Sequence, residues 1–477
     1  YTLSQYTLPK TKKGSEITVE LALKDVENLK LLRTLAVSSA TTNVFIPVGS
    51  ELSVNNNEKA VDAPNAVVPI HASSPLAVSS YTADTTPPEI EKYILDKDAG
   101  KLYLYFTEPV NGNVSMQHLT LQSSQLLETG DTSFQLTKGS KLEDDSNSKN
   151  LTVQFSKQDL NFIRSLRVGA FLVVEKHFTA DLASPHNALT AIEDGSAQAV
   201  FRTIYDTTDP ELVSFSIDMG DGYIYMNFSE PVLPSTLNVT AIHLVDSVSA
   251  SKGSSISLTK DTVSYDGAGT ELTLNMNLNP TDLNTLKLHS TICKDSDSAF
   301  ILIDPNAVTD MAEYPNQIEK IESGNALAVT EFLRDVKRPE LRSFDLDINP
   351  LSPHYKHLTL RFNEPIDASE VDVSKLKVQN GSDIRVGNVK FIVLSSSMQP
   401  STDGNIIDIF LDDQTVERLT QITEVREGGA NKNKTFLVAP KAAAVDMFFN
   451  PMIPFNDTEA LQLGPTLASF TMDMDSS

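Results

Sequence analysis

The sequence of 477 residues contains a single cysteine, Cys293, so no disulfide can form within the chain. Folding without disulfides requires domains that bury an adequate core, which domains of about 120 residues can do. A lone cysteine in such a domain is usually a small buried apolar side chain. We expect this of Cys293, rather than a reactive thiol.

Basic residues are also scarce. The chain has 38 lysines and arginines against 63 acidic residues, which gives a formal net charge of −25. An acidic surface repels nucleic acid and anionic lipid and favours cations. No apolar run approaches the ~20 residues that a membrane-spanning helix needs, whereas the hydrophobic fraction of 40% suffices for ordinary cores. We predict folded domains with no nucleic-acid partner and no membrane span in this sequence.

Recognisable catalytic motifs are missing as well. The eight histidines are scattered, and the sequence has no His-Glu-x-x-His, no Gly-x-Ser-x-Gly and no phosphate-binding glycine loop. Acidic residues recur in every copy of a repeat, whereas the carboxylate pair of a glycosidase belongs to one cleft. His118 and His243 occupy the same repeat position, each before a leucine, which indicates a scaffold role. We predict that the protein is not an enzyme.

The sequence does contain a motif that recurs four times. Its first copy begins Asp84-Thr-Thr-Pro-Pro, continues through a β-prone segment to Asp96, and ends Phe106-Thr-Glu-Pro-Val110. In each copy an aspartate lies eight residues after the anchoring proline. The prolines follow at steps of 122, 129 and 126 residues, at Pro88, Pro210, Pro339 and Pro465. Such spacing indicates a tandem array of like modules.

Other landmarks keep the same order in each repeat. A strand and a helical turn lie at residues 17–29, 151–163, 272–286 and 407–419. An Asp-led loop and a short closing strand follow, and the short alternating segments between turn residues are typical of an antiparallel β-sandwich. We therefore predict an all-β fold of tandem Ig-like antiparallel β-sandwich domains. The predicted boundaries are a partial domain at 1–83, domains at 84–205, 206–334 and 335–463, and the first strand of a following domain at 464–477, as in a window from a longer polypeptide.

The linkers predict how the modules are joined. Proline lacks an amide donor and holds the residue before it in an extended conformation, so Asp84-Thr-Thr-Pro-Pro is stiff. A linker of about five residues is too short for free swivelling. We expect an elongated, semi-rigid rod of modules, with Glu108 at the same pole of its module as Asp84.

These motifs carry a family resemblance. The pattern Asp-Thr-Thr-Pro-Pro-x-Leu-x-Ser-Phe-x-Leu-Asp, then Leu-x-Leu-x-Phe-Ser-Glu-Pro-Val and an Asp-x-x-x-Asn loop, resembles the bacterial-type Ig-like (Big or SbsA-like) repeats of surface-layer proteins. It is still more similar to tandem arrays in giant cell-surface proteins of algae and other protists. The resemblance covers nearly the whole chain and implies a spacer, adhesin or filament subunit. In the loop, Pro185 and Tyr314 stand where Asn450 supplies the asparagine.

Carboxylates at the repeat junctions are candidates for a metal site. Calcium takes six to eight oxygen ligands, and acidic pairs at a linker would supply several. The candidate ligands are the linker aspartate and the strand-end glutamate of each copy: Asp84 with Glu108, Asp206 with Glu230, and Asp335 with Glu364. The alternative is that they are turn and capping residues, since no EF-hand loop is present.

Seven Asn-x-Ser/Thr sequons are candidates for N-linked glycans if the chain is secreted. They are Asn113, Asn150, Asn227, Asn238, Asn380, Asn433 and Asn456. Chance predicts about this number from the composition, so only position is informative. Asn113 and Asn238 lie at matching places after the Glu-Pro-Val turn, where the third repeat has Asp372. The alternative is an unmodified turn asparagine.

Two functions from different classes fit these features. The first is a structural segment of a long extracellular filament, such as a flagellar hair, a cell-surface fibril or a matrix cable, with copies of itself or other fibre subunits as partners. The second is the stalk of a surface adhesin, rigidified by calcium, that binds glycans or partner proteins. Exposed aromatic residues clustered in one module would favour the second, and the nearest candidates are Tyr314 with Pro315 and Phe448 with Phe449. A non-catalytic spacer in a secreted enzyme is a third interpretation.

Overall fold

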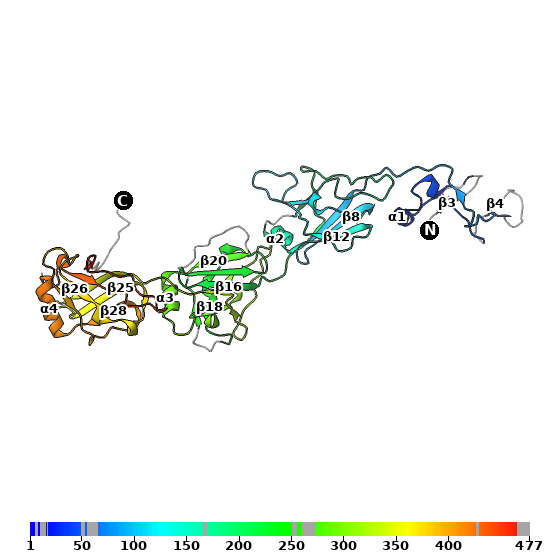
Figure 1. Cartoon of the computed structure of the whole chain (residues 1–477). Coiled ribbons are helices and arrows are strands. Elements are labelled where there is room, and N and C mark those ends of the chain that lie inside the picture. Colours follow the sequence, from blue (N-terminus) through cyan, green and yellow to red (C-terminus); the bar gives the residue numbers. More distant parts are fainter. Residues whose placement is uncertain are drawn as a thin grey trace, which may run out of the picture. The chain divides into compact units, whose positions relative to one another are not determined.

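The structure is a computed structural model that describes residues 1–4, 8–9, 16, 18–48, 53–54, 65–165, 169–249, 255–259, 272–425 and 429–464. The chain forms two compact units, Tyr1–Thr208 with Met311–Asn316 and Asp209–Asp310 with Gln317–Ser477. Strands dominate both units, and the α-helices in the described ranges are short (Figure 1). None of these helices is long and apolar enough to cross a membrane.

The first unit contains a β-sandwich formed by the first full copy of the repeat. One sheet has the strand order β11-β12-β8-β7-β15 and the other the order β10-β9-β13-β14. Neighbouring strands are antiparallel, except that β15 pairs with β7 in parallel. The strands are β7 Ile90–Asp96, β8 Lys101–Val110, β9 Leu119–Gln122, β10 Ser133–Gln135, β11 Lys141–Leu142, β12 Ser148–Gln154, β13 Phe171–Val174, β14 Gln198–Ala199 and β15 Arg202–Ile204.

The hairpin of β7 and β8 shows why the motif folds this way. Along β8, the buried Leu102, Leu104 and Phe106 alternate with more exposed residues, so one face of the strand enters the core. At the turn, Asp96 accepts a hydrogen bond from the amide of Ala99 at 2.8 Å. Gly100 completes it at a φ of +67°, a conformation that glycine adopts readily.

Residues 1–83 form only small elements in the first unit. These are β1 Leu8–Pro9, β2 Val19–Glu20, α1 Leu23–Leu31, β3 Asn43–Val44, β4 Ser53–Val54, β5 Asn65–Ala66 and β6 Leu76–Ala77. Among the described residues of this segment, Asp25 is buried but no apolar side chain is. The segment therefore holds its helix by polar contacts: Asp25 accepts hydrogen bonds from Tyr1 and Ser4 at 2.7–3.1 Å.

The second unit contains two further β-sandwiches. The first has sheets β20-β17-β16-β23 and β19-β18-β21-β22, and the second has sheets β24-β25-β28 and β27-β26-β29-β30. Their strands are β16 Leu212–Asp218, β17 Tyr223–Phe228, β18 Ile242–Val245, β19 Ser255–Ser257, β20 Thr273–Asn277, β21 Phe300–Ile303, β22 Leu327–Ala328, β23 Glu331–Leu333, β24 Leu341–Asp347, β25 His357–Ile366, β26 Lys377–Gln379, β27 Phe391–Val393, β28 Gly404–Phe410, β29 Phe436–Val438 and β30 Leu461–Gln462.

Each sandwich has its own apolar core, centred on Tyr93 and Phe106, on Phe215, or on Phe344. The all-β, Ig-like sandwich fold that the sequence predicted is therefore confirmed. Cys293 belongs to the core around Phe215 and is fully buried, as expected, and burial raises the pKa of its thiol to about 12.

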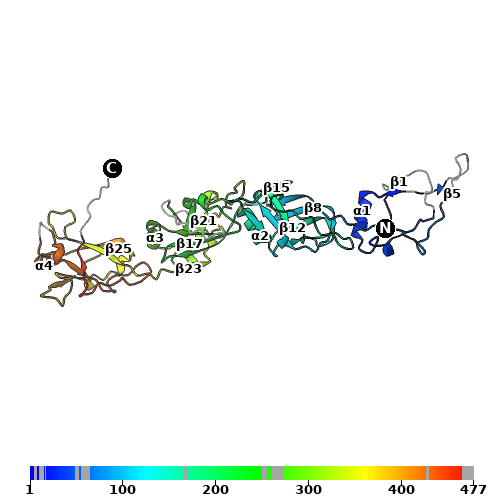
Figure 2. The ribbon, with the colours of Figure 1, turned by 90° about the horizontal axis from the view of Figure 1, so that it is seen from above.

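A short helix joins the two sheets of each sandwich. The sequence predicted a single helical turn here, but the helices are two to three turns long: α2 Lys157–Ser165, α3 Pro280–Leu288 and α4 Asp413–Thr423. Figure 2 shows α2 beside β12, the strand that precedes it. Buried aspartates in the first turn attach two of these helices to earlier loops, the one that follows β10 and the one that follows β19. Asp159 accepts a hydrogen bond from the amide of Thr137 at 3.1 Å, and Asp282 from that of Thr259 at 2.9 Å. Single 3₁₀ turns lie at Ser39–Thr41, Met116–His118, Pro234–Thr236, Val239–Ala241, Ser296–Ser298, Pro305–Ala307, Ala368–Glu370, Val373–Lys375 and Lys432–Lys434.

Candidate functional site

The predicted carboxylates meet a basic side chain from the preceding repeat. In the first unit, Lys30 on the last turn of α1 places its Nζ 2.7 Å from Asp84 Oδ2 and 2.5 Å from Glu108 Oε2. Asp181, from the Asp-led loop, lies beside these two carboxylates and is buried. We call these four residues the Lys30 cluster. The Lys30 side chain is 29% exposed, so water still reaches it.

The same arrangement occurs in the second unit. Lys287, on the last turn of α3, places its Nζ 2.6 Å from Asp335 Oδ2 and 2.5 Å from Glu364 Oε2. Asp446 from the Asp-led loop completes what we call the Lys287 cluster. Here the lysine side chain is only 3% exposed and all three carboxylates are buried. This cluster is thus the desolvated counterpart of the Lys30 cluster.

Burial and neighbouring charges set the pKa values in the Lys287 cluster. Burial raises the pKa of Glu364 to about 7, with Asp335 and Asp446 adding to the rise and Lys287 opposing it. Burial alone would lower the pKa of Lys287, but its contacts with Asp335 and Glu364 outweigh this and the pKa is raised. Three carboxylates share one ammonium, so the cluster carries excess negative charge when all three are ionised.

The Lys30 cluster differs in one respect. Burial alone would raise the pKa of Asp84, but hydrogen bonds from Lys30 and Thr86 lower it below its ordinary value. Burial still raises the pKa of Glu108, because the ammonium only partly offsets it. The more exposed ion pair therefore holds the linker aspartate firmly in its charged form.

The junction after the first full repeat uses an arginine. Arg164, on the last turn of α2, contacts both carboxylate oxygens of Asp206 at 2.8 Å and donates to the carbonyl of Lys97 at 2.9 Å. Such two-pronged arginine–carboxylate pairs are geometrically specific. The remaining predicted carboxylate, Glu230, lies in the second unit, as does Asp310 of the Asp-led loop, and both are buried there.

An asparagine in the Asp-led loop binds the linker backbone. Asn450 Nδ2 donates to the carbonyl of Asp335 at 3.1 Å and to Asp446 Oδ2 at 2.8 Å. Asn187 does the same for Asp84 and Asp181, at 3.1 and 2.7 Å.

In the remaining loop, Asn316 Nδ2 donates to the carbonyl of Asp206 at 3.4 Å. The prediction that Pro185 and Tyr314 replace this asparagine was wrong, because the first two loops are two residues longer than the third. A usable signal was the buried apolar residue two positions after each asparagine, at Leu189, Ile318 and Met452.

Apolar contacts accompany the charged ones. Phe448 is 4% exposed and belongs to the core around Phe215, and Lys294 lies over its ring at 5.1 Å. Its neighbour Phe449 is 65% exposed. In the first unit, Leu182 of the Asp-led loop lines a cavity of 370 Å³ together with Lys30. Of the predicted aromatic candidates, Phe448 therefore packs at a junction, while Tyr314 is exposed and makes an edge contact with Tyr205.

The clusters have carboxylates close enough for one calcium ion, but a lysine already contacts them. The three carboxylates of each described cluster offer oxygens within 4.8 Å of one another, a spacing that one cation can bridge. The lysine ammonium already lies against two of the three, so calcium would have to displace it. Asp84 and Asp335 also accept amide hydrogen bonds from Thr86 and Lys337, which are the turn contacts of the alternative interpretation. Calcium binding stays a prediction.

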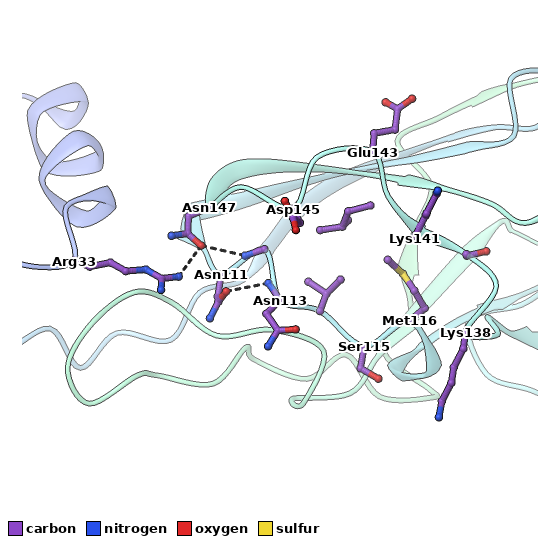
Figure 3. A pocket seen from close by; sticks show the side chains of 14 residues that line it. Arg33, Asn111, Asn113, Ser115, Met116, Lys138, Lys141, Glu143, Asp145 and Asn147 are labelled. Atoms are coloured by element: carbon purple, nitrogen blue, oxygen red, sulfur yellow. Dashed lines mark hydrogen bonds between the residues drawn. The ribbon is translucent and has the colours of Figure 1, made fainter.

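A larger cavity of 840 Å³ lies beyond the end of β8 (Figure 3). Arg33 and the amide of Gly112 both donate to Asn147 Oδ1, at 3.0 and 3.3 Å. A Cβ on Gly112 would lie 1.9 Å from the carbonyl oxygen of Asp145, so only glycine permits this approach. The lining mixes basic and acidic side chains and includes neither histidine nor cysteine.

The predicted glycosylation sites all lie at or near the surface. Asn113, Asn150, Asn227, Asn433 and Asn456 are exposed, and Asn238 and Asn380 are half-buried. Asn227 Nδ2 donates to Ser214 at 2.9 Å within its sheet. Occupancy of the sequons stays a prediction.

Comparisons with known proteins add little beyond this. No protein-family model and no curated protein matches the chain. The crystal structure of the N-terminal part of the bacterial S-layer protein SbsC is similar at 14% identity and a TM-score of 0.17, covering 43% of this chain and 45% of that one. A crystal structure of titin domains is similar at 8% identity and a TM-score of 0.18, covering 78% and 97%. The crystal structure of domains FN1–FN3 of chicken CNTN1 is similar at 7% identity and a TM-score of 0.16, covering 79% of this chain and 99% of that one.

The chain spans less than half the length of that SbsC structure. Likenesses at these TM-scores carry no argument about function. The fold assignment rests on the sheets and cores described above.

Proposed function

We propose that the chain is a structural segment of a long extracellular filament or cell-surface fibre, built from tandem Ig-like domains and joined to copies of itself or to other fibre subunits. The observation that carries the proposal is the repetition of one inter-repeat contact. The Lys30 and Lys287 clusters use the same residue types at the same repeat positions. A catalytic site would be confined to one repeat.

The contact suits a structural role because it joins two repeats through the linker. The lysine comes from the helix of one repeat, and the carboxylates come from the linker and the strand end of the next. Ionic attraction is stronger in a desolvated site than at the surface. The loop asparagine also fixes the linker backbone. We infer that these contacts restrict bending and support a semi-rigid rod.

Electron microscopy of the native material tests this function. A periodic fibre with a repeat related to the module length is the expected result. Isolated particles with freely bent modules would contradict it and support the adhesive function.

The adhesive function is the second candidate, and one observation favours it. On the outer face of β28, Phe410 is 57% exposed and Ile406 is 47% exposed. The ring of His357 meets that of Phe410 at 5.6 Å. The corresponding positions in the other two sandwiches are polar: Asn150 and Gln154 on β12, and Thr273 and Asn277 on β20. An exposed apolar patch in one repeat suits a binding surface.

The variant Phe410→Ser with Ile406→Thr tests this candidate. If the patch binds glycans or a protein, the full chain should lose attachment to glycan-coated or cell surfaces while its unfolding midpoint stays unchanged. Gln154→Ala is the matched control on β12, at the position that corresponds to Phe410. Equal attachment of both variants would exclude the patch.

Calcium and N-linked glycans are separate proposals for this chain. For calcium, the thermal unfolding midpoint of the chain is measured with and without a chelator. A lower midpoint in chelator would support calcium at the clusters, and an unchanged midpoint would remove it. For glycans, a mass decrease of the native protein after treatment with an N-glycosidase would establish occupancy.

A further inference from the structure

The four helices can be aligned by their N-caps. Ala22, Asn279 and Asp412 are the N-caps of α1, α3 and α4, and Ser156 accepts the corresponding hydrogen bond before α2. Eight residues after the N-cap, the first three helices have a basic residue and the fourth has a threonine: Lys30, Arg164, Lys287 and Thr420.

Thr420 does not replace the missing charge. Its hydroxyl donates to the carbonyl of Glu417 at 2.6 Å, within its own helix. The helix pole of the third full repeat therefore presents no cation to a neighbour from this position.

The acidic partner is lost at the same repeat. The closing strands can be aligned by an equivalent hydrogen bond in each. An amide donates at 2.9–3.0 Å to the carbonyl of the residue just before the neighbouring strand, and the donors are Val78, Val200, Val329 and Leu463. In the first three repeats the linker aspartate follows six residues further along and the anchoring proline ten residues further along, whereas Pro465 follows Leu463 after Gly464 alone, with no aspartate between them. The helix without a base is thus followed by a linker sequence without the acid.

We infer that the base on the last helical turn and the linker aspartate act together as the specificity determinant for docking one repeat onto the next, an inference that rests on the proposed structural function. The surface that accepts a neighbour is the acidic pole formed by the linker aspartate, the strand-end glutamate and the loop aspartate. The partner that fits it is a like module whose helix has Lys or Arg eight residues after its N-cap. A neighbouring module whose helix lacks this base leaves the three carboxylates of the acidic pole to repel one another, which disfavours docking.

Hydrogen exchange of the full chain tests the inference, followed at the linker amides of residues 334–338. Lys287→Met should speed exchange there at least tenfold, because breaking a buried ion pair opens the contact. The amides of β25 should keep their protection. The charge-exchanged variant Lys287→Glu with Glu364→Lys should recover most of the loss. Thr420→Lys is the matched control, a new lysine on a helix without an acidic partner, and should leave the linker unchanged.

The inference would be overturned if Lys287→Met left the exchange rates of the linker amides unchanged. It would also be overturned if these amides exchanged as fast in the double variant Lys287→Glu with Glu364→Lys as in the faster of its two single variants. If Lys287→Met exposes the β25 amides and so unfolds the sandwich, the variant Lys30→Met of the half-exposed lysine is used instead, and exchange is followed at the amides of residues 79–86. The proposed filament function fails separately, on the electron micrographs, because docking of neighbours in one chain can hold whether or not chains form fibres.

Discussion

The Lys30 cluster and the Lys287 cluster have the same composition but different burial. The Lys287 side chain is almost fully buried. Phe448 packs into the apolar core to which α3, the helix of Lys287, also contributes. The Lys30 ammonium is partly open to water, next to a 370 Å³ cavity, and its helix belongs to a segment without buried apolar residues in its described part. The two clusters have the same charged residues, so the surrounding apolar packing sets how far each ion pair is shielded from water.

The largest expected effect comes from removing the buried lysine. Lys287→Met leaves three buried carboxylates without their cation, so we expect the free energy of unfolding to fall by about 3–5 kcal/mol. Denaturant unfolding of the full chain, followed by signals from the second unit, measures this. Lys356→Met removes a surface pair with Asp413 and serves as the control that should show no measurable change. Equal effects of the two variants would show that the Lys287 cluster is not desolvated.

The next effect concerns the apolar residue at the same junction. Phe448→Ala removes a buried ring from the core around Phe215, and we expect a loss of about 3 kcal/mol. The adjacent Phe449→Ala changes an exposed ring and should cost within about 0.5 kcal/mol. The same denaturant experiment compares them. Similar losses from both would mean that packing at this junction does not distinguish the two rings.

A smaller effect is expected at the exposed cluster. Lys30→Met should lower the free energy of unfolding by at most about 1 kcal/mol, because solvent screens the pair. Raising the salt concentration from about 0.05 to 0.5 M should remove most of this difference, while the effect of Lys287→Met persists. If salt changed both equally, the contrast between the clusters would be lost.

A further expected effect is a dependence of stability on pH. Burial raises the pKa of Glu364 to about 7 from an ordinary value of 4.5, so between these values the folded chain holds a proton that the unfolded chain releases. Its contribution to stability is therefore largest below pH 4.5 and declines as the pH rises to about 7. Carboxyls with lowered pKa, such as Asp84, act in the opposite sense, since their contribution is lost on acidification.

Glu364→Gln isolates this contribution. Unfolding midpoints between pH 5 and pH 7.5 should fall less steeply with rising pH in the variant than in the parent protein. Parallel curves would show that Glu364 does not change its protonation across this range.

Much of the fold could be predicted from the sequence. Alternation in segments such as Lys101–Val110 identified the strands, and the recurrence of the Asp-Thr-Thr-Pro-Pro and Glu-Pro-Val motifs brought Asp84 and Glu108 to the same pole. The lysine between them was missed because it lies on a helix more than 50 residues away, and nothing local marks it as a partner. The loop asparagine was misaligned because loop length varies while the side-chain contact is kept.

The parallel pairing of β15 with β7, and of β23 with β16, has a mechanical consequence. Chain entry and chain exit of each of these two sandwiches are adjacent strands, so tension applied at the two linkers slides them past each other. Their hydrogen bonds then bear the force simultaneously and do not open one at a time.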